Sequence, residues 1–114
     1  MKTHTFDLNA KYFDLIKAGE KTYEIRLNDK KRKLLNVGDT LIFKRNPKRQ
    51  ETITTEVTGL YYFKSFKELA DNLPIDKIGF SKREDFLNVI RGFYTKEDEE
   101  YLGVVAIKLH ISTE

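Results

Sequence analysis

Residues 52–63 form the longest run of strand-favouring residues in the chain, with β-branched and aromatic side chains recurring along it. Gly59, inside the run, predicts a β-bulge. Four shorter runs alternate apolar and polar residues or are strongly apolar, and these are residues 2–8, 21–27, 40–44 and 104–111. Because most connections between the runs are short, neighbouring strands should be mostly antiparallel, which favours a small closed barrel.

Three helices are predicted between these strands. Asn9 can cap a helix that extends to about residue 18 and stops at Gly19. Two capping boxes, Ser65 to Glu68 and Ser81 to Glu84, each open a helical pattern. The first of these helices should end before Pro74, and the second should bury Phe86, Leu87, Ile90 and Phe93, with a short acidic turn from Thr95. The predicted fold is α+β: a barrel of about five to six strands with two to three packed helices.

The composition excludes several classes of protein. With 114 residues, we expect one domain over residues 1–114. The absence of cysteine excludes disulfides and thiolate chemistry, and the two distant histidines match no metal motif, so we expect no metal and no cofactor. No apolar run is long enough for a membrane span or a signal peptide, so we expect a cytoplasmic monomer without a membrane partner.

Positive charge is concentrated in one part of the sequence. The net charge is only +3, yet residues 30–49 hold many basic side chains and Asp39 as the one acidic residue. Clustered charge of this kind is typical of a phosphate-binding surface, and also of solvated loops. The candidate phosphate contacts are Lys30, Lys31, Arg32, Lys33, Lys44 and Arg45.

The segment from Gly19 to Arg26 carries the strongest functional signal. Glu24 and Arg26 are two residues apart on a predicted strand, so their side chains leave the same face. Lys21 lies at the turn before the strand. In one interpretation, Glu24 and Arg26 form a solvent-exposed ion pair of little energetic consequence. In the other, the three charged side chains line a solvent-filled cleft, because an unpaired charge in the protein interior is unfavourable.

The same segment resembles the G-x-K-x-x-E-x-R signature of the ASCH family, the activating signal cointegrator homology domains. Other landmarks of that family appear in order along the chain: the helix at residues 12–19, the Val37-Gly38-Asp39 turn, the helix start at residues 65–69 and the last strand near residues 101–107. The resemblance implies a PUA-like barrel with a cleft that binds RNA or a nucleotide. It also implies that Lys21, Glu24 and Arg26 are cleft residues.

Three further residues are candidates for the same cleft. Asp29 follows the signature strand and could pair with Arg26. Tyr62 could stack on a base, as aromatic side chains do in single-strand binding. Tyr94 follows the last long predicted helix, and the resemblance implies that it lines the cleft.

Catalysis is an open alternative. Some proteins similar to the ASCH family deacetylate N4-acetylcytidine, and another is a ribonuclease, which suggests a hydrolase in which Lys21 and Glu24 handle protons. The amidohydrolases, however, have threonine where this chain has Glu24, and their second carboxylate aligns near Gly79. The negative charge of Glu24 should also raise the pKa of Lys21 and disfavour it as a base. A third hypothesis is a protein-interaction module whose basic loop meets an acidic partner; the sequence identifies no protein partner.

Overall fold

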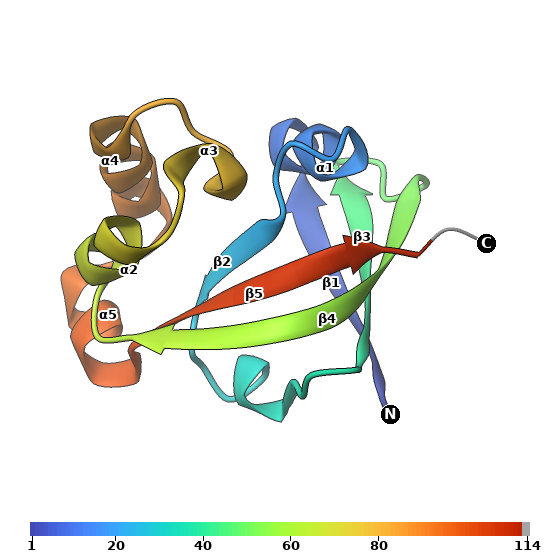
Figure 1. The fold of residues 1–114 in the computed structure, drawn as a ribbon, viewed down its shortest axis with the longest axis horizontal. Helices are drawn as coiled ribbons and strands as arrows, with labels where there is room; N and C mark the ends of the chain where they lie inside the picture. The colour runs from blue at the N-terminus through green and yellow to red at the C-terminus, as the bar shows by residue number, and fades with distance from the viewer. Residues whose placement is uncertain (113–114) are drawn as a thin grey trace.

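The computed structural model describes residues 1–112 (Figure 1). In chain order the elements are β1 (Thr3–Asn9), α1 (Ala10–Lys17), β2 (Tyr23–Leu27), the 3₁₀ turn η1 (Arg32–Leu34), β3 (Thr40–Asn46), β4 (Thr52–Phe63), α2 (Phe66–Asn72), α3 (Ile75–Ile78), α4 (Arg83–Phe93), α5 (Lys96–Leu102) and β5 (Val104–Ile111). The α+β prediction and its five strands are confirmed.

The five strands form one sheet in the order β1-β3-β4-β5-β2. β1 and β3 are parallel, and the other neighbours are antiparallel. β1 and β2 are therefore the two edges of a curved half-barrel. Its hydrogen-bonded ladder does not close between these edges. The Arg26 side chain on β2 instead donates to the backbone oxygen of Asp7 on β1, at 3.0 Å.

Two hydrophobic clusters pack on the two faces of β5. Val105 and Ile107 contact the cluster that includes α1, β1 and β3, whereas Val104 and Ala106 contact the cluster formed with α2, α3 and α4. Figure 1 shows the corresponding division, with α1 over one part of the sheet and the other helices gathered at one end. Phe86 and Ile90 of α4 are buried as predicted. On the strands Tyr23 is only half-buried, and the following are buried: Ile25, Phe43, Val57, Val105 and Ile107.

Short-range signals account for most element ends. Ser65 caps α2 by accepting a hydrogen bond from the Glu68 N–H at 3.0 Å, and the sheet register shifts between Val57 and Gly59, as a bulge predicts. The prediction of a second capping box at Ser81 is wrong. Helix α4 begins at Arg83 after an N-cap at Lys82, so Ser81 lies outside the helix.

The segment after Thr95 is a full helix rather than a short turn. The Thr95 hydroxyl accepts from the Asp98 N–H at 3.1 Å and starts α5. Within residues 1–112, no helix has the length and apolar character needed to cross a bilayer.

Candidate functional site

A cavity of about 340 Å³ lies where the edge strands meet the helices. Polar side chains from β1, from the signature segment and from the end of β3 line the cavity. They are Asp7, Asn9, Lys21, Glu24, Arg26 and Asn46. Its aromatic lining comes from α1, α4 and the segments that flank α4, as Tyr12, Phe80, Phe86, Phe93 and Tyr94. All three signature charges therefore line one cavity.

The loop after α1 directs the Lys21 side chain toward the protein interior. Gly19 has a φ of 81°, a left-handed conformation that suits glycine and ends α1. The Lys21 N–H then donates to the Leu15 oxygen at 3.1 Å, and the Thr22 N–H donates to the Lys77 oxygen at 2.9 Å. The second bond ties the start of β2 to α3, so Lys21 lies between the two helices.

The Lys21 side chain is 4% exposed and surrounded by acceptors. Its Nζ donates to the backbone oxygens of Tyr23 and Ile78, each at 2.7 Å, and lies 3.4 Å from Oε1 of Glu24. An ammonium has three N–H donors and no acceptor, so this environment matches its capacity. Lys21 therefore holds Glu24 in place, and backbone oxygens take two of its three donors.

Burial lowers the pKa of Lys21 and outweighs the opposing effect of Glu24. Glu24 acts to raise this pKa, as expected, but the expected net increase is wrong, because the sequence does not reveal how completely the ammonium is removed from water. The three acceptors around Nζ nevertheless suit the protonated form, since a neutral amine would direct its lone pair at an oxygen.

Glu24 and Arg26 form a buried ion pair rather than an exposed one. Arg26 Nε donates to Glu24 Oε2 at 2.6 Å. Burial acts to raise the pKa of Glu24, but Arg26 and Lys21 together hold it below its ordinary value. Burial likewise acts to lower the pKa of Arg26, and Glu24 outweighs that effect and raises it. Both groups are therefore charged at neutral pH.

Aromatic side chains line the same cavity as these charges. Tyr94 stacks on Phe66 with ring centroids 5.5 Å apart, and burial raises its pKa. Phe93 lines the cavity and is 60% exposed. The prediction that Phe93 is a core residue is wrong, because the last turn of α4 extends beyond the cluster that buries Phe86 and Ile90.

Two candidate ligand residues lie elsewhere. Tyr62 is 55% exposed and does not line the cavity, because β4 is the central strand of the sheet and the cavity lies at its edges. Asp29 does not pair with Arg26. It accepts from the Arg32 N–H at 3.0 Å and from Arg32 Nη1 at 3.2 Å, since a turn brings residues 29 and 32 together.

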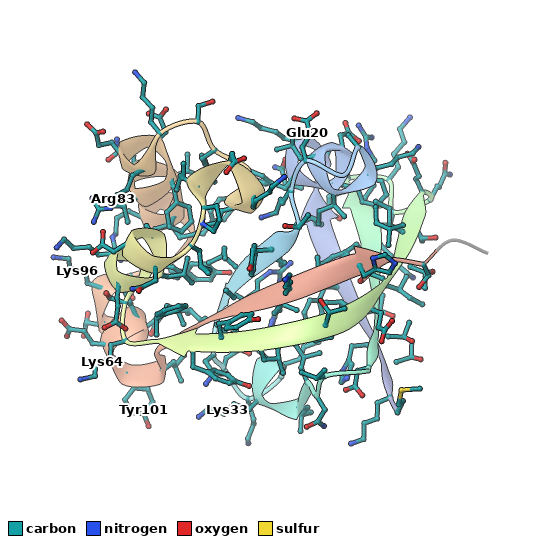
Figure 2. All side chains as sticks on the ribbon, viewed as in Figure 1. Glu20, Lys33, Lys64, Arg83, Lys96 and Tyr101 are labelled. Carbon is teal, nitrogen blue, oxygen red and sulfur yellow. The ribbon has the colours of Figure 1, made fainter. Side chains whose placement is uncertain are left out.

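The basic residues do not form one patch around Lys21. Arg45 makes two hydrogen bonds to the Asp14 carboxylate, at 3.0 and 3.2 Å. Lys44 lies beside Asp7 in the β1–β3 ladder. Figure 2 shows Lys33 and Glu20, the neighbour of Lys21, at opposite ends of the molecule.

Within the basic loop, only Lys31 and Arg32 return to the sheet. Lys31 Nζ donates to the Thr5 oxygen at 3.4 Å. The Arg32 guanidinium lies over the Phe6 ring, 4.3 Å from its centroid. Lys30 and Lys33 are exposed.

Several lining residues were not among the predicted site residues. Tyr12, on α1, faces the cavity, with Lys21 Nζ 5.8 Å from its ring centroid. Asn9 was assigned only a capping role, and Asn46 lines the cavity from the end of β3. No local pattern shows that the ends of β1 and β3 meet β2 and α4 around one space.

A model of the ASCH domain matches residues 7–112, and the chain belongs to the ASCH domain family. Among solved structures, the crystal structure of the hypothetical protein PH0355 is similar over 98% of this chain and 100% of its own, with 34% identity and a TM-score of 0.82. The solution structure of protein PF0455 from Pyrococcus furiosus covers 100% of both chains, with 27% identity and a TM-score of 0.76.

An ASCH domain from Lactobacillus crispatus shares the fold at 16% identity, with a TM-score of 0.69 over 96% of this chain and 79% of its own. No curated protein matches the chain.

Proposed function

We propose that this ASCH domain binds RNA or a nucleotide and places one base or ribose in the cavity. The proposal is carried by one observation: the Glu24–Arg26 pair, in which the buried Lys21 holds Glu24, lines a cavity of about 340 Å³ together with aromatic side chains. That volume falls in the range of small-molecule sites, roughly 300–1,000 Å³.

The polar groups offer both a donor and an acceptor. Among the contacts of the described residues, Arg26 uses Nε for Glu24 and Nη2 for Asp7, which leaves Nη1 for a ligand carbonyl or ring nitrogen. The Glu24 carboxylate has about four lone-pair sites, so it can accept from an exocyclic amine while holding both cations. Phe93 and Tyr94 supply rings on which a base can stack.

Backbone phosphates would extend from the cavity toward the basic loop. Lys30, Lys31 and Lys33 suit this contact better than Arg45, which is held by Asp14. Attraction of this kind depends on charge and is independent of sequence, so it complements recognition in the cavity.

The test compares two exposed aromatic side chains. Phe93 lines the cavity, whereas Tyr101 is 88% exposed on α5 and projects from the lower edge of the molecule (Figure 2). Binding of a labelled single-stranded RNA of mixed sequence is measured by fluorescence anisotropy for Phe93→Ala and Tyr101→Ala. We expect Phe93→Ala to weaken binding by roughly 1–3 kcal/mol and Tyr101→Ala to leave it unchanged. Equal effects of the two substitutions would refute binding in the cavity.

The hydrolase hypothesis is tested in the same samples. If the bound RNA, or N4-acetylcytidine added separately, is converted to product, the domain is an enzyme. Binding with intact ligand supports the binding function. The acceptors around Lys21 Nζ favour binding, because they stabilise the ammonium, whereas a general base needs a free lone pair near its substrate.

A further inference from the structure

Two arginines from different segments share one buried aromatic ring. The Cζ atoms of Arg32 and Arg26 lie 4.3 and 5.1 Å from the centroid of Phe6, which is almost fully buried. The two guanidinium carbons are therefore less than about 10 Å apart, a range in which like charges interact measurably when partly buried. Arg26 lines the cavity, so Arg32 lies within about 10 Å of a group in its lining.

The charges around this ring do not cancel. Arg26 is paired with Glu24 and Arg32 with Asp29, while Lys21 adds one charge beside Glu24 and Lys31 another, 5.1 Å from the Phe6 centroid. These four cations stand against two carboxylates, and the carboxylate of Asp7, which also lines the cavity, is matched by Arg49. Burial and the nearby Arg26 both lower the pKa of Arg32, so the site holds positive charge that an anion would stabilise.

The guanidinium of Arg32 also has a hydrogen-bond donor without a partner. Arg32 Nε is buried without a partner among the described residues, and the guanidinium pairs with Asp29 through Nη1. A buried donor without an acceptor is unfavourable. Tyr94 lines the same cavity as Arg26, and its hydroxyl is a further hydrogen-bond donor there.

We propose that Arg26, Arg32 and the Tyr94 hydroxyl form a subsite for a phosphate group at the end of the cavity nearest residues 28–35. A phosphate presents three or more acceptor oxygens, and planar guanidinium groups bind them through pairs of N–H donors. The subsite deepens the proposed function and rests on it: the preferred ligand is a nucleotide, with its base toward Glu24 and its phosphate between the two arginines.

The subsite can be tested without a base by titrating inorganic phosphate at constant ionic strength. Arginine Nε–Hε signals are followed by ¹H–¹⁵N NMR in the ¹⁵N-labelled wild-type protein and its variants. We expect the Arg26 and Arg32 signals to shift saturably. Arg32→Gln should weaken phosphate binding by at least about tenfold, since it removes charge-assisted hydrogen bonds.

The matched control is Arg45→Gln, which removes another arginine paired with a carboxylate, Asp14, but one that neither lines the cavity nor lies over Phe6. This variant should bind phosphate as the wild type does. Arg32→Lys keeps the charge near Phe6 but loses the planar fork, so it should bind several-fold more weakly than the wild type. Tyr94→Phe keeps the ring stacked on Phe66 and removes only the hydroxyl, so a smaller loss of affinity is expected.

A linear, non-saturating shift in the wild-type protein would overturn the subsite, as would equal losses in Arg32→Gln and Arg45→Gln. Titration with the four nucleosides separates this failure from failure of the proposed function. Nucleoside binding without phosphate binding leaves the cavity proposal intact and removes the subsite. Saturable phosphate binding, with neither nucleosides nor RNA bound in the cavity, supports the subsite alone.

Discussion

Gly79 packs directly against the aliphatic part of Lys21. A Cβ atom at position 79 would stand 3.2 Å from Cδ of Lys21 and 3.4 Å from Cδ1 of Leu15. The residue before it, Ile78, supplies the backbone oxygen that Nζ of Lys21 reaches at 2.7 Å. The end of α3 therefore fits closely around the lysine that holds Glu24, and this fit leads to the first two predictions.

Gly79→Ala should destabilise the domain. Gly79 has a φ of 107°, so alanine would adopt a strained backbone while its methyl group presses on Lys21. We expect the free energy of unfolding in urea to fall by roughly 1–3 kcal/mol. The control is Gly92→Ala in α4, where nothing lies within 4 Å of the new Cβ and stability should rise by up to about 1 kcal/mol. A loss of similar size in both variants would contradict the packing argument.

The protein should show little turnover of N4-acetylcytidine, and Glu24→Thr should not create it. The deacetylating relatives need a lysine base and a second carboxylate, whereas here Lys21 Nζ faces three acceptors and position 79 is glycine. Chromatographic detection of cytidine measures the reaction. Robust turnover that Lys21→Ala abolishes would show that the prediction is wrong.

Stability should fall with acid through Asp39. This buried carboxylate accepts from the Lys2 and Asn36 N–H groups at 3.1 and 3.0 Å and lies 2.9 Å from Nε2 of His4. The hydrogen bond with His4, followed by those from the backbone, lowers its pKa from 3.8 to about 2. Because the folded state holds this proton less tightly than the unfolded state, the stabilisation is complete above about pH 4 and lost toward about pH 2.

Urea unfolding of the wild type and of Asp39→Asn at several pH values measures this effect. The difference in unfolding free energy between them should shrink as the pH falls through that window. A difference that stays constant from neutral pH to about pH 2 would rule out Asp39 as the titrating group.

RNA binding should weaken steeply with salt, in part through the basic loop. Lys30 and Lys33 are exposed, so charge reversal at both should lower affinity without unfolding the domain. For a single strand, each lost phosphate contact should reduce the slope of log affinity against log salt by roughly 0.7. Lys96→Glu on α5 is the control, and anisotropy titrations at several salt concentrations are the measurement. An affinity that does not change with salt would instead indicate a small neutral ligand.

The order of elements and several of their ends could be predicted because they depend on residues close together in sequence. The Ser65 cap, the Gly19 stop and the bulge at Gly59 each act over a few residues, and all three lie where they were expected. The alternation of residues 21–27 also placed Glu24 and Arg26 on one face of a strand. The family signature added Lys21 to the predicted cleft residues, and Lys21 lines the same cavity.

Tertiary packing decided the rest. Whether Glu24 is exposed or buried depends on α3, which lies about fifty residues away in the chain and covers β2 through the bond from Thr22 to Lys77. The same distant contacts bury Lys21 and lower its pKa, leave Phe93 beside the cavity rather than in the core, and place Tyr62 on a central strand away from it. Periodicity shows which residues share a face, but only the folded chain determines what covers that face, because burial is a sum over neighbours remote in sequence.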